Sequence, residues 1–168
     1  MQKADFYKTI TGHFWRSAVK FKIGIEYLGT ARRILREETE KMSYKQLLSD
    51  YLDGTCFDAY TYFGAHPETR DQVAGWVFRV WAPHATKVQV AGEMNGWNGD
   101  MAEMERITPY GVYEYFSPDA WNGMMYRYRI FQQDGQVTFR SDPYAFRSQL
   151  RPEYASVTCD ITNYRCRD

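Results

Sequence analysis

The feature that most constrains the fold of this sequence is a period-two alternation of apolar residues that begins after Gly75. Apolar residues occupy every second position from Trp76 to Val80, and the run ends at Ala82-Pro83. Successive side chains of a strand point to opposite faces of a sheet, so short alternating runs between turn residues are typical of a β-sandwich. Similar runs occur further along the chain, over residues 87–90, 112–116, 124–130 and 136–139.

The pattern therefore predicts a β-sandwich within residues 73–163. The Asp134-Gly135 pair supplies a hairpin turn before the last run. The side chains expected among the packed residues of the sandwich are Trp81, Val88, Val90, Tyr113, Tyr128 and Ile130.

The first third of the sequence has a different texture, typical of helices. Residues 14–40 contain no proline, and apolar residues from Tyr27 to Leu35 step by threes and fours, as one face of a helix does. We expect a second short helix to begin with Ser43 as its N-cap and to end at Asp53-Gly54. The predicted fold is mainly β, with three parts: a helical N-terminal extension over 1–53, a lead-in segment over 54–72 and the β-sandwich over 73–168.

Charge is divided unevenly between these parts. Residues 1–45 hold ten Lys and Arg against five Asp and Glu, whereas residues 46–168 hold eleven against sixteen. We expect the apolar face of residues 28–35 to pack against the sandwich or the short helix. A basic helix on a membrane surface is the alternative, but the glutamates within residues 37–40 interrupt the basic face and disfavour it.

The composition excludes several classes of function. The 168 residues carry 21 Lys and Arg against 21 Asp and Glu, and this zero net charge argues against a nucleic-acid or anionic-membrane binder. No apolar run approaches the roughly 18–20 residues that span a bilayer. The three cysteines cannot all pair within the chain and show no metal-ligand spacing, so we expect no structural zinc, no disulfide framework and a cytoplasmic location.

No catalytic motif or cofactor-binding loop is recognisable in the sequence. The isolated histidines are expected at the surface or in turns: His13, His66 and His84. Three carboxylates that could serve glycoside chemistry are expected to be solvated surface charges: Glu103, Glu105 and Glu114. The sequence therefore predicts no catalytic residue, no metal and no cofactor.

Six short motifs follow one another in the second part of the sequence. They are FRVWAP at residues 78–83, VQVAGEMNGWN at 88–98, GVYE at 111–114, YRYRI at 126–130, DPYAF at 142–146 and RPEYASV at 151–157. In this order and spacing they resemble the family 48 carbohydrate-binding module that precedes the catalytic barrel of α-1,4-glucan branching enzymes. Residues 53–66 resemble the lead-in of those enzymes. The resemblance implies an immunoglobulin-like β-sandwich.

The resemblance also implies a carbohydrate-binding surface around Trp97. Members of the family that bind glucan have a Trp at this position, and an aromatic face packs on the C–H groups of a sugar while polar groups bind its hydroxyls. The expected polar partners are Asn95, Asn98 and Arg127, the last of which stands where the family has Lys.

Other positions depart from the family pattern. The second Trp of the glucan-binding members falls on Val137, their Leu falls on Leu150, and their Asn falls close to Tyr154. With one stacked ring and few donors, we expect binding in the millimolar range, on the order of 4 kcal/mol.

The function that the resemblance implies is non-catalytic: binding and positioning of an α-1,4-glucan for a glycogen branching enzyme, which cuts an α-1,4 linkage and re-forms it as α-1,6. The catalytic residues of such enzymes lie in the barrel that would follow residue 168, so we expect no transferase activity. The expected partners are an α-glucan and that barrel, with no nucleic acid and no membrane.

Two alternatives remain open. One is a purely structural brace, in which Trp97 and a loop of interdomain contacts bury against the barrel; the loop residues are Asp142, Pro143, Tyr144 and Phe146. The other is a glycogen-sensing module of the kind found in a kinase, which Val137 disfavours.

Overall fold

The computed structural model describes residues 45–162 of the chain. The chain divides into two units, Met1–Phe57 and Asp58–Asp168, and each is described by itself. The helix predicted within residues 14–40 and the predicted cap at Ser43 lie outside the described residues.

The described part of the first unit is a short helix. Residues 45–52 are helical, and a turn at Asp53-Gly54 follows, in which the Asp53 amide donates to the carbonyl of Ser49 at 3.0 Å. Gly54 has a φ of 74°, a left-handed conformation that favours glycine and ends a helix. The predicted end of this helix is therefore confirmed.

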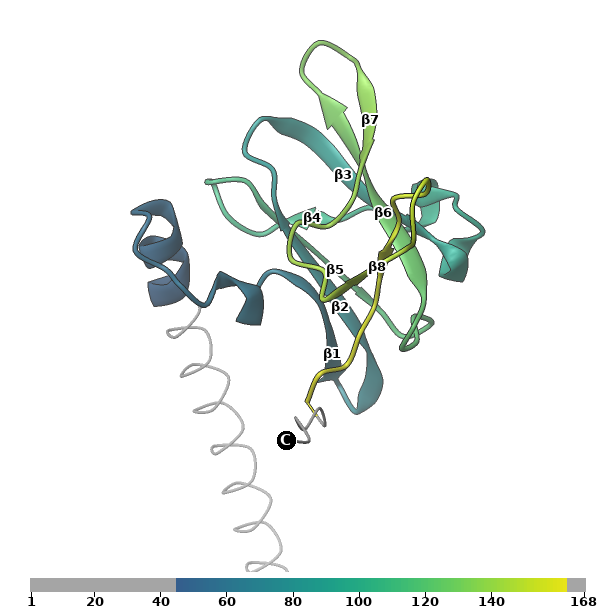
Figure 1. Cartoon of the computed structure of the whole chain (residues 1–168). Coiled ribbons are helices and arrows are strands. Elements are labelled where there is room, and N and C mark those ends of the chain that lie inside the picture. Colours follow the sequence, from purple (N-terminus) through teal and green to yellow (C-terminus); the bar gives the residue numbers. More distant parts are fainter. Residues whose placement is uncertain (1–44, 163–168) are drawn as a thin grey trace, which may run out of the picture. The chain divides into compact units, whose positions relative to one another are not determined.

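The second unit is a sandwich of two antiparallel sheets (Figure 1). The first sheet has the order β1-β2-β5-β4, with bounds β1 (Gly64–Arg70), β2 (Val73–Trp81), β5 (Val112–Ser117) and β4 (Glu105–Arg106). The second has the order β3-β6-β9-β8, with β7 also paired to β6; its bounds are β3 (Ala85–Gly92), β6 (Met125–Gln132), β9 (Ser156–Val157), β8 (Arg147–Ser148) and β7 (Val137–Arg140). The predicted immunoglobulin-like β-sandwich is confirmed.

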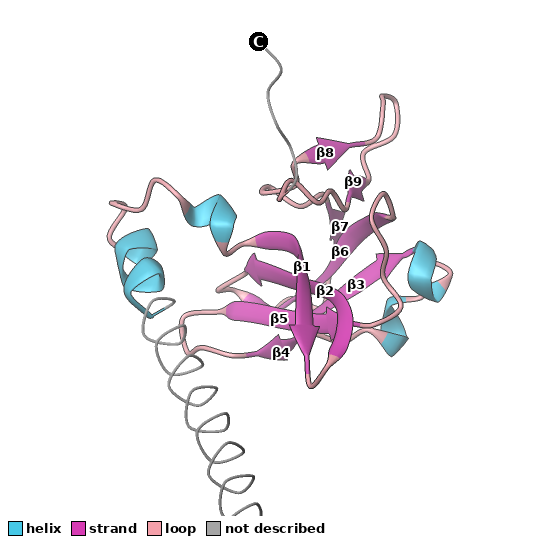
Figure 2. Cartoon of the chain, turned by 90° about the horizontal axis from the view of Figure 1, so that it is seen from below, coloured by secondary structure: helices cyan, strands magenta, loops and turns pink. Residues whose placement is uncertain are grey.

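Short 3-10 helices lie in the connections of this unit, as Figure 2 shows. Their bounds are η1 (Ala59–Thr61), η2 (Glu93–Asn95) and η3 (Gly99–Met101). Both η2 and η3 follow β3 at one margin of the second sheet, so the chain makes two tight turns there before it reaches β4.

The core lies between the facing sides of the two sheets. Strand β2 contributes Trp76, Phe78 and Val80, and the partners from other strands include Val88, Val90, Tyr113, Tyr126 and Tyr128. Most of the packed residues expected from the sequence are therefore buried, and Ile130 packs against the same core while partly buried. Burial of each large apolar side chain contributes about 1.5–3 kcal/mol, so this layer is the main stabilising element.

Trp81 is the exception among the predicted packed residues. It is 40% exposed, and its Nε1 donates to the carbonyl of Tyr110 at 2.9 Å. Alternation along β2 places Trp81 on the face opposite to Phe78, at the last residue of the strand. The prediction that Trp81 packs in the core is wrong because the core face of β2 carries the even-numbered residues.

Strand β1 lies within residues 54–72, the segment interpreted from the sequence as a lead-in. It pairs with β2 along its whole length through a two-residue turn at Asp71-Gln72, where both residues have positive φ, 48° and 67°. Such hairpin turns usually carry Asn-Gly or Asp-Gly, so this turn has a weak sequence signature. Pro67 is tolerated because β1 is an edge strand.

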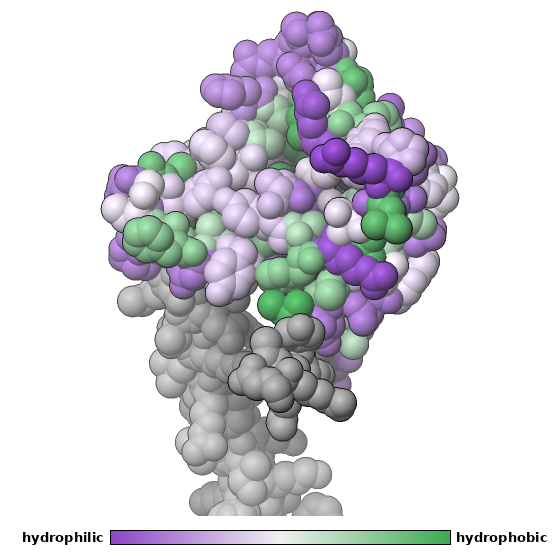
Figure 3. Space-filling model, in the orientation of Figure 1, coloured by the Kyte–Doolittle hydropathy of each residue, from purple (hydrophilic) through white to green (hydrophobic). Residues whose placement is uncertain are grey.

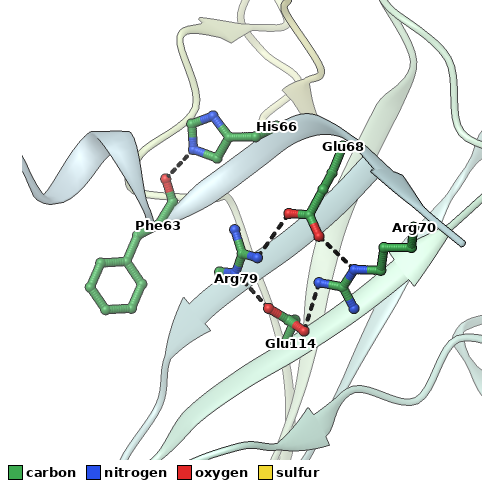
Figure 4. Close-up of polar contacts among 6 residues, drawn as sticks. All are labelled: Phe63, His66, Glu68, Arg70, Arg79 and Glu114. Atoms are coloured by element: carbon green, nitrogen blue, oxygen red, sulfur yellow. Dashed lines mark hydrogen bonds and ion pairs between the residues drawn. The ribbon is translucent and has the colours of Figure 1, made fainter. Parts of the chain in front are cut away.

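Four charged side chains form a closed ring of ion pairs on the outer face of the first sheet (Figure 4). Arg79 of β2 donates to Glu114 of β5 at 2.6 Å and to Glu68 of β1 at 2.9 Å. Arg70 of β1 donates to Glu68 at 2.5 Å and to Glu114 at 2.8 Å. The Glu114 side chain is only 17% exposed, so the expectation of a solvated surface charge is wrong there.

Glu68 and Arg79 of this ring keep their charges in spite of burial. Burial raises the pKa of Glu68, but the hydrogen bond from Arg70 and the charge of Arg79 outweigh it, and the pKa lies below its ordinary value of 4.5. Burial lowers the pKa of Arg79, but the charges of Glu114 and Glu68 outweigh this effect of burial. The pKa of Arg79 therefore lies above its ordinary value. The ring therefore fastens β1, β2 and β5 together.

On the face shown in Figure 3, hydrophobic residues form small separate groups among hydrophilic ones. The hydrophilic end of this view belongs to the hairpin between β6 and β7. Among the described residues, no helix is long and apolar enough to cross a membrane.

Candidate functional site

Trp97 lies in a tight turn that follows β3 and η2. Gly96 and Trp97 both have left-handed backbone conformations, with φ of 59° and 65°. Glycine adopts this conformation freely, whereas for a residue with a side chain it costs about 1–2 kcal/mol. The Trp97 amide donates to the carbonyl of Gly92 at 2.8 Å and closes the turn. The side chain of Trp97 is 41% exposed, so the strained turn presents an indole to solvent.

The Asn95 side chain holds this turn. Its Oδ1 accepts from the Gly92 amide at 3.0 Å, and its Nδ2 donates to the Val90 carbonyl at 2.8 Å. Both ends of the amide are committed to the backbone of the same segment. Asn95 therefore positions Trp97. The expectation that Asn95 also binds a ligand stays a prediction.

Asn98 remains on the surface beside the indole. Its Oδ1 accepts from the Asp100 amide at 3.2 Å and caps η3. Its Nδ2 makes no hydrogen bond to the described residues 45–162, so this side chain retains a donor for a ligand.

Strand pairing brings Arg127 of β6 to Trp97. Ala91 of β3 lies opposite Arg127, so the turn after β3 lies beside the Arg127 side chain. The Cζ of Arg127 is 5.5 Å from the centroid of the Trp97 ring, within the range of a cation–π contact. Two of the four residues expected at the site, Trp97 and Arg127, are therefore in contact.

Arg127 also contacts a second aromatic ring, that of Tyr154. Its Cζ is 3.7 Å from the Tyr154 centroid, and its Nη2 donates to Glu153 at 3.1 Å. Strand β6 pairs Tyr126 with Ser156 of β9, which places the residues just before β9 beside Arg127. The sequence marked Tyr154 only as a position near a family Asn, and the contact with Arg127 was missed because it depends on this short pairing.

The guanidinium of Arg127 is held by these contacts without full hydrogen bonding. Its Nε is buried and has no hydrogen-bond partner among the described residues. A buried donor without a partner costs about 1–3 kcal/mol, so such groups call for an explanation in terms of structure or function. The position of the guanidinium is therefore set by the two rings and by Glu153.

The loop expected to contact a second domain is partly built into the sandwich. Asp142 is buried, and its Oδ2 accepts from the hydroxyls of Tyr126 at 2.5 Å and Tyr128 at 3.1 Å. Its Oδ1 accepts from the Tyr144 amide at 2.8 Å. Both Asp142 oxygens therefore accept hydrogen bonds inside this unit. An interdomain role for this loop stays a prediction.

The aromatic residues of the same loop contact the start of the unit. The Tyr144 ring stacks on Phe63 with centroids 5.5 Å apart. Phe146 makes edge contacts with Tyr60 and His66, and it remains 38% exposed. His66, expected at the surface or in a turn, lies instead in β1 and is half-buried, with Nε2 2.9 Å from the Phe63 carbonyl. Pro143 is exposed. Tyr144 and Phe146 therefore pack within the chain.

Burial governs the titration of this cluster. Burial raises the pKa of Asp142 above its ordinary value of 3.8, against the opposing effect of the hydrogen bonds from Tyr126, Tyr144 and Tyr128. Burial, and then the charge of Asp142, raises the pKa of Tyr126 and of Tyr128 well above 10.0. Both hydroxyls therefore stay protonated and act as donors to the carboxylate.

The remaining family positions lie on the surface. Val137 is 41% exposed in β7, and Leu150 is 87% exposed in the loop before β9. Within the part of the chain that the structure describes, no group of three or more His, Cys, Asp or Glu could hold a metal ion. The chemistry available around Trp97 is thus stacking, cation–π contact and hydrogen bonding.

The geometry defines an antiparallel β-sandwich that displays an aromatic and cationic surface at the margin of one sheet. Residues 62–145 match carbohydrate-binding module 48, the isoamylase N-terminal domain. The chain belongs to this family of carbohydrate-binding modules.

Individual relatives are similar over part of the chain. The 1,4-alpha-glucan branching enzyme of Geobacillus stearothermophilus is 40% identical over 116 residues, which cover 69% of this chain and 18% of that enzyme. A Klebsiella pneumoniae pullulanase complexed with maltotriose has a TM-score of 0.46 and 25% identity, over 57% of this chain and 9% of the pullulanase. A Bacillus acidopullulyticus pullulanase has a TM-score of 0.45 and 21% identity, over 59% of this chain and 12% of that one.

Proposed function

We propose that this chain is the non-catalytic α-glucan-binding module of a 1,4-alpha-glucan branching enzyme and positions glucan chains for glycogen biosynthesis. The family match and the 40% identity to a branching enzyme support the class of ligand. The transfer of chains from α-1,4 to α-1,6 linkage belongs to the relative and comes to this chain only as part of this proposal. The free thiol of Cys159 fits the reducing cytoplasm in which we propose that this chain acts.

The observation that carries the proposal is the strained presentation of Trp97. A left-handed tryptophan costs free energy, and such outliers persist where the surroundings enforce them, most often at functional sites. Here Asn95 enforces the conformation, and the result is an exposed indole beside a cation. An ordinary packing tryptophan would need neither the strain nor the exposure.

The proposed contact combines one stacked sugar ring with a few hydrogen bonds. Asn98 and Arg127 are the donors beside the ring, and each hydrogen bond contributes about 1 kcal/mol net. Together with the stacking, this gives millimolar affinity, on the order of 4 kcal/mol. We propose further that the module contacts the catalytic barrel of its parent enzyme through a different surface.

The experiment is an isothermal calorimetric titration of the purified chain with maltoheptaose, carried out on the wild type and two variants. Trp97→Ala removes the proposed platform. Trp121→Ala is the matched control, because it removes a tryptophan that is 49% exposed in the loop before β6. Cellohexaose, a β-linked glucan of similar chemistry, tests the selectivity for the α linkage.

The expected result is millimolar binding of maltoheptaose by the wild type and by Trp121→Ala, with none by a folded Trp97→Ala variant. Equal binding by all three proteins would place the glucan on another face. A folded wild type that binds no α-glucan would favour the structural brace, in which the same residues bury against the barrel.

A further inference from the structure

Tyr154 shares with Trp97 the features of a stacking platform. It is 49% exposed, it lies in the loop before β9 of the second sheet, and it contacts the same guanidinium as Trp97 does. We propose that Tyr154 is a second sugar-stacking residue, and that Arg127 joins the two rings into one binding surface for an α-glucan. This inference rests on the proposed function, because it extends the site around Trp97.

The backbone fixes Tyr154 although its side chain is exposed. Ser141 donates from Oγ to the Tyr154 carbonyl at 2.5 Å, and the Gln149 amide donates to the Ala155 carbonyl at 2.8 Å across the loop. The pairing of β9 with β6 begins at Ser156, two residues further on. The ring is therefore presented from an anchored loop, so little ordering is needed when a ligand binds.

The contact between Arg127 and Tyr154 requires the shape of arginine. A separation of 3.7 Å between Cζ and the ring centroid is a stacking distance for a planar guanidinium. The compact ammonium of a lysine would keep the charge and lose the stacking. The unpaired, buried Nε fits a guanidinium that is placed mainly by the two rings and by the one hydrogen bond to Glu153.

One edge of the guanidinium remains available to a ligand. Its Nη2 donates to Glu153. Its Nη1 makes no hydrogen bond to the described residues, and it is not one of the buried side-chain atoms without a partner among them. A glucan lying across both rings would place its hydroxyls beside this donor. The protein offers flat aromatic contacts and a single cationic hydrogen-bond donor. The ligand that fits this surface is a neutral polyhydroxylated chain with apolar ring faces.

The test is a double-mutant cycle on maltoheptaose affinity, with calorimetry on the whole chain. The variants are Tyr154→Ala, Tyr154→Phe, Arg127→Lys and the double variant Tyr154→Ala with Arg127→Lys. We expect Tyr154→Ala to weaken binding about fivefold, since an aromatic contact of this kind contributes that much, while Tyr154→Phe stays within about twofold of the wild type. Arg127→Lys should weaken binding about threefold in the wild type and have no further effect in the Tyr154→Ala background.

Nuclear Overhauser contacts between maltoheptaose C–H protons and the Tyr154 ring give a second readout that needs no variant, and the inference expects them. Wild-type affinity in Tyr154→Ala, together with lost binding in Trp97→Ala, would overturn the inference and leave the proposed function intact. Independent, additive effects of Arg127→Lys and Tyr154→Ala would overturn the role of Arg127 as the link. Unchanged binding in Trp97→Ala would instead overturn the proposed function, and the inference with it.

Discussion

Trp97 is exposed in an unfavourable, left-handed backbone conformation. Hydrogen bonds between Asn95, Gly92 and the Trp97 amide hold the turn in that conformation. The presence of an important ring at this position could be predicted from the sequence. The role of Asn95 could not, since the direction of its amide depends on where the turn places the Val90 carbonyl. A side chain that points inward to the backbone and one that points outward to a ligand have the same sequence signature.

The strain at Trp97 gives a prediction that separates stability from binding. Trp97→Gly should be more stable than Trp97→Ala by about 1 kcal/mol, because glycine adopts a φ of 65° without a steric cost and alanine does not. Both variants should lose maltoheptaose binding. Urea unfolding of the two variants measures the difference. Equal stabilities would show that the left-handed conformation is not maintained in solution.

The ion-pair ring gives a prediction on pH. The folded pKa of Glu68 is below 4.5, so its ionised form adds stability that is complete above the unfolded pKa and is lost as the pH falls through the folded value. Glu68→Gln should therefore be less stable than the wild type by about 1–2 kcal/mol at pH 7, and this difference should shrink below about pH 4.5.

Unfolding of the wild type and Glu68→Gln between pH 7 and pH 3 measures that difference. Glu103→Gln is the matched control, because the Glu103 side chain is 59% exposed and lies 3.5 Å from Lys87 in a single surface pair. A pH-independent difference between the wild type and Glu68→Gln would contradict the assignment of the shift to Glu68.

Secondary-structure elements with strong alternation were predictable, and those that depend on pairing were not. The runs that became β2, β3, β5, β6 and β7 carry apolar residues at every second position. In β1, by contrast, Pro67, Glu68 and Arg70 replace that pattern, and the ion pairs and the edge position compensate. The two-residue strands β8 and β9 have no periodicity to detect, yet β9 places Tyr154 at the site.

Gly75 tests how closely β2 and β5 approach each other. A Cβ at this position would lie 2.4 Å from the carbonyl oxygen of Ser117 and 2.7 Å from the Phe116 ring. Gly75→Ala should therefore force the strands apart at this end and destabilise the sandwich by about 1–3 kcal/mol. Thermal unfolding measures the loss, with the exposed neighbouring variant Ala74→Ser as the control. An unchanged midpoint in Gly75→Ala would mean that the strand ends are looser than described.

At the scale of the whole molecule, the sandwich is stabilised by its own core and carries a small surface of two rings and a cation. The ion-pair ring is built from β1, β2 and β5, and the core lies between the two sheets, whereas Trp97 and Tyr154 are exposed on the surface. Substitutions at the surface should therefore change binding without unfolding the sandwich. The sequence predicted the sandwich and one of the two rings, whereas the second ring follows from the order of strands around β6.

Glucan binding at the Trp97 surface is tested by a map of backbone amide shifts in the ¹⁵N-labelled chain on addition of maltoheptaose. We expect the shifting amides to cluster at residues 95–98, at Arg127 and at Glu153-Tyr154, and those around Trp121 to stay unchanged. Shifts centred on the outer face of β1, β2 and β5, or on the loop of Trp121, would contradict it.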